Sequence, residues 1–110
     1  MIDPEAVLQT MRESAPQYAQ AKAERIYLEE FRRSKKALLM QQARADGTDS
    51  VNGQERDALA HNDYLAILDG LCAATEVEER LRWHLEVARL EVEVWRTKQA
   101  SERMILRSHE

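Results

Sequence analysis

The strongest constraint on the fold is a seven-residue apolar repeat in the last forty-odd residues of the chain. Stepping alternately by three and four residues from Tyr64 to Leu106 meets an apolar side chain at ten of thirteen positions. The positions are Tyr64, Ile67, Leu71, Ala74, Glu78, Leu81, Leu85, Ala88, Val92, Trp95, Gln99, Glu102 and Leu106. This spacing is the a/d pattern by which helices pack lengthwise against each other. The repeat therefore predicts one long helix over residues 63–108.

The charged residues beside the repeat favour a helix over a strand. Residues 90–94 alternate apolar and acidic side chains, which is a strand pattern, but no turn residues bracket them. Three glutamates spaced seven apart each precede an arginine by three residues: Glu79–Arg82, Glu86–Arg89 and Glu93–Arg96. Such pairs stabilise a helix by about 0.2–0.5 kcal/mol each.

A second apolar face runs along the middle of this helix, nearly opposite the repeat. Its members are spaced as helix neighbours: Trp83, Val87, Leu90 and Val94. A surface helix needs only one apolar face, so two faces indicate that the helix is packed on both sides. The chain has only one other long helical segment, which can cover one face. The sequence therefore predicts self-association, with these four residues at the interface to another subunit or to a partner protein.

The first half of the chain predicts two helices separated by a break. Asp3 and Pro4 form a typical helix start, which predicts a short helix over residues 4–13. Ser14 to Gln17 matches a capping box around Pro16, so a long helix is expected over residues 16–45. The clearest apolar stripe of this helix is expected to pack on the seven-residue repeat, and consists of Tyr27, Phe31, Ser34 and Leu38.

Turn-forming residues at 46–53 predict a loop between the two long helices. A short helix is expected over residues 54–60, with Asn52 as its cap. Whether residues 53–108 form one helix or two, separated near His61, stays open at this point. The predicted architecture is all-α: one domain, residues 1–110, consisting of a long antiparallel helical hairpin with a short N-terminal helix. It is coiled-coil-like and self-associating.

The composition excludes several classes of protein. The single Cys72 cannot form an internal disulfide, which fits a reducing compartment. The chain shows no signal peptide and no apolar run near the ~20 residues of a membrane span, so we expect a cytoplasmic protein with no membrane contact. The three histidines and the cysteine match no zinc spacing. No catalytic constellation is visible, and the sequence predicts a non-enzymatic protein without metal or cofactor.

Charge is distributed unevenly, with a net +4 over residues 16–45 and a net −8 over residues 46–93. Six basic residues of the second predicted helix could contact nucleic-acid phosphates: Lys22, Arg25, Arg32, Arg33, Lys35 and Lys36. These positions spread around most of a helix, however, and two other interpretations stay open. The residues could form a solvated face, or they could pair with the acidic part of the last helix.

Four segments together resemble small uncharacterised helical proteins of tailed bacteriophages and prophages: residues 24–28, 31–40, 94–97 and 100–103. The resemblance implies the cytoplasm of a bacterial host and a link to replication or recombination, and it carries no functional residue with it. Three hypotheses follow. The first is a self-associating interaction protein that serves as a phage accessory factor. The second is a DNA-binding accessory of phage recombination or replication, and the third is an acidic inhibitor of a host defence or nuclease protein.

Overall fold

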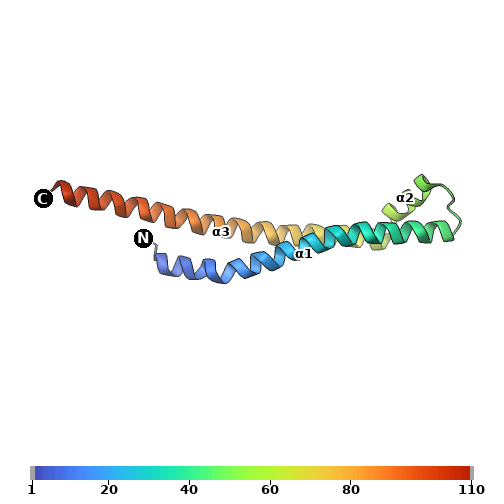
Figure 1. Cartoon of the computed structure of the whole chain (residues 1–110), viewed down its shortest axis with the longest axis horizontal. Coiled ribbons are helices and arrows are strands. Elements are labelled where there is room, and N and C mark those ends of the chain that lie inside the picture. Colours follow the sequence, from blue (N-terminus) through green and yellow to red (C-terminus); the bar gives the residue numbers. More distant parts are fainter. Residues whose placement is uncertain (1, 110) are drawn as a thin grey trace. The chain divides into compact units, whose positions relative to one another are not determined.

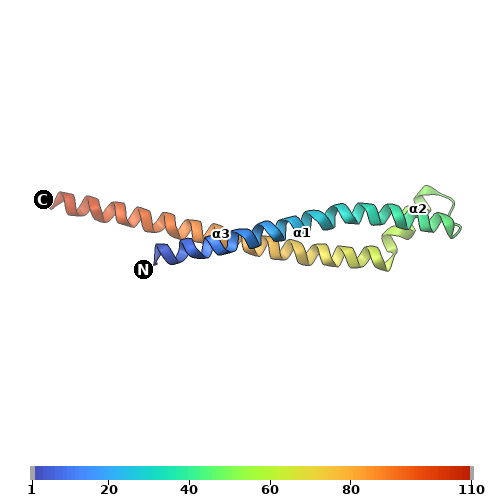
Figure 2. The same ribbon diagram turned by 60° about the horizontal axis from the view of Figure 1, so that its bottom comes forward.

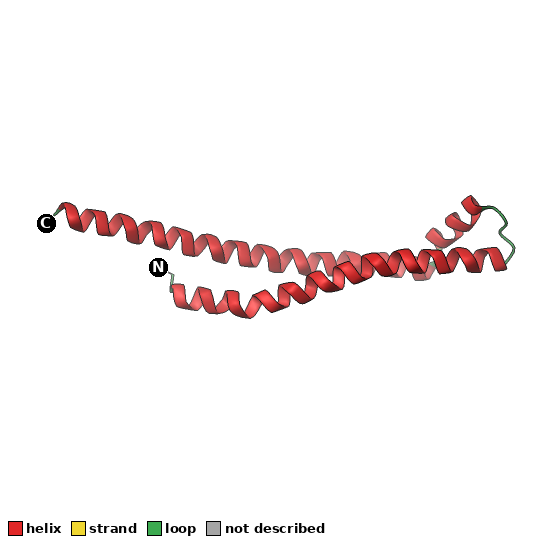
Figure 3. Ribbon diagram, viewed as in Figure 1, coloured by secondary structure: helices red, strands yellow, loops and turns green. Residues whose placement is uncertain are grey.

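The computed structural model describes residues 2–109, which form three helices and no strand (Figures 1 and 3). The helices are α1 (Pro4–Ala45), α2 (Val51–Ala60) and α3 (Asn62–Ser108). The chain divides into two compact units. Unit 1 consists of Met1–Ala19 and Glu79–Glu110, and unit 2 consists of Gln20–Glu78. In each unit a segment of α1 lies beside an antiparallel segment of α3, which confirms the all-α hairpin (Figures 1 and 2).

Helix α1 is continuous, so the predicted break between residues 4–13 and 16–45 is wrong. Its start is as expected, because the Asp3 carboxylate accepts a hydrogen bond from the Glu5 N–H at 3.1 Å. Pro16 lies inside the helix, where it removes the N–H that would bond to the Arg12 carbonyl. Both Pro16 and Arg12 are exposed. Water can therefore bind the freed carbonyl, and the proline ring meets no partner helix.

The end of α1 is set by Gly47, which has φ 110°. Only glycine adopts this left-handed backbone conformation without strain. It allows the Thr48 N–H to reach the Ala43 carbonyl at 2.9 Å and the Gly47 N–H to reach the Arg44 carbonyl at 3.1 Å. These two bonds satisfy carbonyls that the helix end would otherwise leave unpaired.

Helix α2 begins earlier than the sequence predicted, and its cap is Ser50 rather than Asn52. The Ser50 hydroxyl accepts a hydrogen bond from the Gly53 N–H at 3.0 Å. Ser50 has an extended backbone (φ −83°, ψ 143°), as an N-cap requires, whereas Asn52 lies within the helix. The loop is correspondingly shorter than residues 46–53.

A break at His61 separates α2 from α3, which resolves the question that the sequence left open. His61 has an extended backbone (φ −68°, ψ 139°), and its N–H bonds to the Ala58 carbonyl. Its ring Nδ1 accepts a hydrogen bond from the Asp63 N–H at 3.0 Å. One residue thus ends one helix and caps the next.

The seven-residue repeat of α3 is the inward face of the helix as far as Gln99. Every repeat position from Tyr64 to Gln99 is buried or half-buried, whereas Glu102 and Leu106 are exposed. In unit 2 the repeat packs at Tyr64 against Leu39 of α1 and Ala58 of α2, which form the buried cluster. The predicted helix and its seam are confirmed up to that point.

The stripe of α1 that was expected to pack on this seam faces outward, so this prediction is wrong. Tyr27, Phe31 and Leu38 are 65%, 38% and 56% exposed, and Ser34 is exposed as well. The inward face of α1 carries Leu39 together with smaller and charged residues that include Ser14, Ala21, Arg25 and Lys35. Acidic residues of α3 form ion pairs with the charged members of this set. The spacing of apolar residues along one helix cannot predict such pairs between helices.

Candidate functional site

The Trp83 stripe, consisting of Trp83, Val87, Leu90 and Val94, is an exposed apolar surface on the α3 segment of unit 1. The four side chains are 56%, 50%, 48% and 54% exposed, respectively. The Trp83 ring also lies 4.7 Å from the Arg82 guanidinium carbon, in a cation–π contact that covers one ring face. The other three members are aliphatic. Half-exposed apolar residues at regular heptad spacing are typical of a surface that another helix covers.

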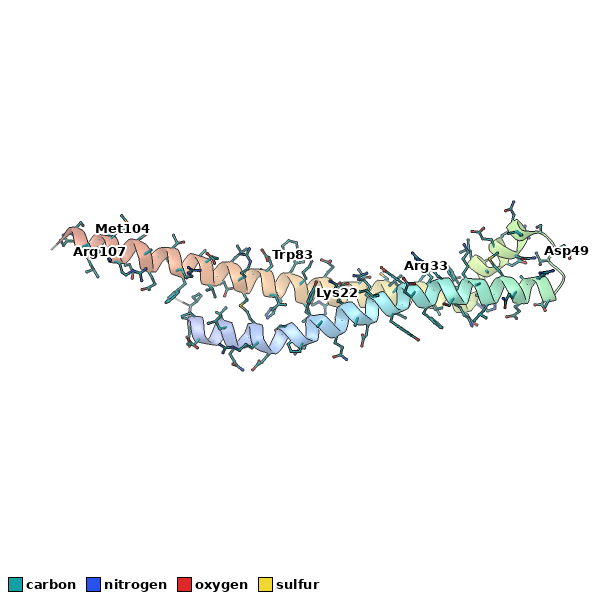
Figure 4. All side chains as sticks on the ribbon, in the orientation of Figure 1. Lys22, Arg33, Asp49, Trp83, Met104 and Arg107 are labelled. Atoms are coloured by element: carbon teal, nitrogen blue, oxygen red, sulfur yellow. The ribbon has the colours of Figure 1, made fainter. Side chains whose placement is uncertain are left out.

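The same heptad register continues beyond Val94 to the end of α3. Its next positions are Thr97, Ser101, Met104 and Ser108, all of which are exposed. Figures 1 and 2 show that α3 continues past the N-terminal end of α1 within this unit. We call residues 97–108 the α3 extension. In Figure 4 the labelled Trp83 and Met104 project from the same edge of α3.

The α3 extension exposes three consecutive large apolar residues. Met104, Ile105 and Leu106 are 70%, 57% and 66% exposed. Within the described residues this segment is packed only as far as Gln99, and so short an unsupported helix is marginal in water, because tertiary packing supplies most of the stability of protein helices. The extension therefore has the properties of a segment that packs against another chain.

An open apolar groove of about 530 Å³ lies beside the Trp83 stripe. Its lining consists of Ile2, Val87, Leu90, Glu91, Val94, Trp95 and Lys98. Ile2 comes from the chain just before α1, and the other lining residues belong to α3. The lining thus combines apolar side chains with two opposite charges, Glu91 and Lys98.

A second exposed stripe lies on α1 in unit 2 and consists of Tyr27, Phe31 and Leu38. The Tyr27 and Phe31 rings are stacked, with centroids 6.0 Å apart and planes 8° from parallel. Their apolar spacing predicted a core position, so the sequence did not point to them as an exposed surface. A signal was available in the charges, because Arg25 and Lys35 fall on the side of α1 that carries Leu39 and not on the stripe.

Three of the six basic residues predicted to contact nucleic acid form ion pairs with α2 or α3. Arg25 makes a two-bond pair with the buried Glu78 carboxylate and also donates to Glu29 at 2.9 Å. The other two pairs join Lys35 to Asp63 at 3.4 Å and Lys36 to Glu55 at 2.8 Å. This geometry matches the interpretation in which the basic residues pair with the acidic part of the chain.

The other three basic residues of the set make no ion pair with α2 or α3 within residues 2–109. Lys22 is exposed and Arg32 is half-buried. Arg33 is exposed and lies 3.9 Å from Glu30, a neighbour on the same helix. DNA binding by the six-residue set stays a prediction, with only these three side chains outside the ion pairs to α2 and α3.

The predicted pairs along α3 are all formed in unit 1. Arg82 lies 2.7 Å from Glu79, Arg89 lies 2.7 Å from Glu86, and Arg96 lies 3.4 Å from Glu93. The hydrogen bonding of Arg89 to the Glu86 carboxylate lowers the pKa of Glu86 and raises the pKa of Arg89. The hydrogen bond to Glu79 likewise raises the pKa of Arg82. These pairs are exposed, so they support the helix without occupying the Trp83 stripe.

Within residues 2–109, no three His, Cys, Asp or Glu side chains gather in a way that could hold a metal ion. Cys72 is exposed on α3 and forms no disulfide. None of the helices in the described part of the chain is long and apolar enough to cross a membrane. Comparisons with protein-family models, with curated proteins and with solved structures gave no match.

Proposed function

We propose that this protein is a non-enzymatic, helical interaction protein that associates with itself through the Trp83 stripe. The observation that carries this proposal is the exposure of the stripe: four apolar side chains at heptad spacing are each about half exposed, while the opposite face of the same helix is already packed. Burying such side chains against a second copy favours association by roughly 25 cal/mol of free energy per Å² of apolar surface removed from water.

The thinness of the core supports the same function. Among residues 2–109 the buried apolar residues are few and mostly small: Ala21, Leu39, Ala43, Ala58, Tyr64 and Ala88. No large side chain in this range is fully buried. A chain with so little internal apolar burial gains stability from association, because a partner that binds only the folded state shifts the folding equilibrium.

The resemblance to helical phage and prophage proteins supports a more specific setting. We place the protein in the cytoplasm of a bacterial host, as a phage accessory factor whose assembly presents its outer surfaces to other proteins. The exposed Tyr27, Phe31 and Leu38 on α1 provide a second apolar surface for such contacts. DNA binding and inhibition of a host nuclease remain the other two hypotheses from the sequence.

The test is the solution mass of the wild-type protein and of the Trp83→Glu/Leu90→Glu variant, measured by light scattering over a range of concentrations. We expect an oligomer for the wild type and a monomer for the variant, because two carboxylates in the interface would have to be desolvated. The matched control is Leu59→Glu/Leu65→Glu, which replaces two exposed leucines (39% and 44%) outside the stripe. This control should keep the wild-type mass.

Two results would contradict the proposal. A wild-type protein that stays monomeric at every concentration would exclude self-association, and an oligomer that survives in the Trp83→Glu/Leu90→Glu variant would exclude the stripe as its interface. The same measurement with a short single-stranded DNA separates the hypotheses. A rise in mass with DNA that disappears at high salt would favour the recombination accessory.

A further inference from the structure

We infer that two copies of this chain pair through antiparallel α3 helices, with the α3 extension of each copy lying in the groove beside the Trp83 stripe of the other. This inference rests on the proposed self-association and adds its direction and register. The two-fold axis lies between Trp95 and Arg96. The contact is then the same on both copies, as a symmetric dimer requires.

The heptad register fixes which residues meet across the axis. In an antiparallel helix pair the layers join positions whose numbers have a constant sum, and for an axis between residues 95 and 96 that sum is 191. The layers join Val94 to Thr97, Leu90 to Ser101, Val87 to Met104 and Trp83 to Ser108 of the other copy. Every residue in these layers is exposed in the single chain. The two largest apolar residues, Trp83 and Leu90, each face a serine, which leaves room for them.

The charges of the two segments are complementary. Residues 83–94 carry three glutamates and one arginine, for a net −2. The α3 extension carries one glutamate and three basic residues, for a net +2. Antiparallel pairing places each acidic segment on the basic segment of the other copy, twice over by symmetry. Charge complementarity of this kind fixes register and excludes mispaired arrangements.

The flanking positions show the complementarity residue by residue. The flanking positions lie one residue to either side of the core layers, so their numbers sum to 189 on one side and to 193 on the other. Glu91 therefore lies opposite Lys98 of the other copy, and Glu86 lies opposite Arg107. No ion pair occupies Glu91, Lys98 or Arg107 within the described part of the single chain, and all three are exposed. The remaining flanking pairs, His84 with Ile105 and Glu93 with Ala100, contain no like charges.

Other arrangements lose these contacts. A parallel pair in the same heptad register would set Glu86 beside Glu91 of the other copy, and like charges at that distance are destabilising. An antiparallel pair centred between Val87 and Leu90 would set Glu86 beside Glu93 and would leave the α3 extension uncovered. The register centred between residues 95 and 96 avoids both like-charge contacts and covers the extension.

Cysteine cross-linking tests the direction and the register together. In a background with Cys72→Ser, single variants Val87→Cys and Met104→Cys are oxidised separately and as a mixture. In the inferred dimer, two copies of residue 87 are about 25 Å apart along the axis, from the helical rise of 1.5 Å per residue. Neither single variant should then cross-link to itself. The mixture should give a covalent dimer, because a disulfide needs Cα atoms within about 7 Å.

The outcomes separate this inference from the proposed function. Cross-linking in the mixture alone supports the antiparallel register. A single variant that cross-links to itself means a parallel pair or the shorter register, and it overturns the inference while self-association stands. Wild-type dimers by light scattering with no cross-link in any sample mean that a different face forms the dimer, which overturns the inference. A monomeric wild type overturns both the inference and the proposed function.

A charge exchange checks the flanking pairs independently. Lys98→Glu should weaken the dimer at least tenfold, because it sets two carboxylates opposite each other at two symmetric places. Glu91→Lys in the same chain should restore the wild-type dissociation constant at low salt. A double variant as weak as the single one would show that Glu91 and Lys98 do not meet, and would overturn the register.

Discussion

Replacing Leu39 with alanine should destabilise the protein far more than the same replacement at the neighbouring Leu38. Leu39 is 4% exposed and belongs to the buried cluster with Ala58 and Tyr64, whereas Leu38 is 56% exposed. The sequence pattern alone assigned the inward position to Leu38. The pair of variants therefore tests which face of α1 is packed, with two residues of identical chemistry.

The magnitude follows from burial. Leucine to alanine removes three carbon atoms, worth about 0.8 kcal/mol each when fully buried, so the transfer cost at Leu39 is about 2.4 kcal/mol. A residual cavity adds to this, and measured values for buried leucines start at about 2–3 kcal/mol. We expect about 2.5–3 kcal/mol, because a layer only two or three helices thick can close around the gap. At Leu38, less than half of the side chain is covered, which gives about 1 kcal/mol or less by the same rule.

Thermal unfolding followed by circular dichroism measures both variants. For a domain of this size a loss of 1 kcal/mol lowers the midpoint by roughly 4 °C, so we expect a shift of about 10 °C for Leu39→Ala and 4 °C or less for Leu38→Ala. Each scan is repeated at two protein concentrations, because association makes the midpoint depend on concentration. Equal shifts, or a larger shift for Leu38→Ala at the lower concentration, would refute the inward assignment of Leu39.

Three further predictions concern local contacts. Ser50→Ala should lower the stability by about 1 kcal/mol through loss of the α2 cap, whereas an Asn52→Ala control should have little effect in urea titrations. Glu78→Leu should lower the unfolding midpoint because it leaves Arg25 without its buried partner. The double variant Arg25→Leu/Glu78→Leu should recover the midpoint, because no unpaired charge is then buried. A double variant with no recovery would mean that the ion pair stabilises the protein more than two leucines do in its place. The folded-state pKa of Glu86 is lowered, so its ionised form contributes stability that is complete at neutral pH and is lost as the pH falls below about 4. Glu86→Gln should therefore show a shallower fall in midpoint between pH 6 and pH 3 than the wild type, and parallel pH curves would count against this.

The features that the sequence predicted correctly are those that one helix contains by itself. The extent of α3, its packed seam from Tyr64 to Gln99, and the three Glu–Arg pairs depend only on residue spacing along a single helix. The cap at Asp3 is equally local. The sequence also predicted that the Trp83 stripe is left uncovered within one chain, because α3 has two apolar faces and its hairpin partner can cover only one.

The predictions that failed depended on what surrounds a residue in space. A capping-box pattern at Ser14–Gln17 is compatible with a helix start and with a helix interior. Because Pro16 is exposed, the helix can continue through it. Ser50 and Asn52 are both good cap residues. The choice between them follows from the path of the loop after Gly47, which the neighbouring residues alone do not specify.

By itself, the sequence determined an all-α chain, a long two-faced last helix and its periodic charge pairs, because these follow from backbone periodicity and local hydrogen bonding. Only the tertiary structure decided which face of α1 turns inward. Packing Tyr27, Phe31 and Leu38 would bury more apolar surface, but it would turn Arg25 away from Glu78, a carboxylate that lies on the packed seam of α3. A buried charge separated from its counter-charge costs more than a half-exposed apolar stripe, so the polar contact sets the rotation of α1. The apolar side chains left outside are then available to a partner.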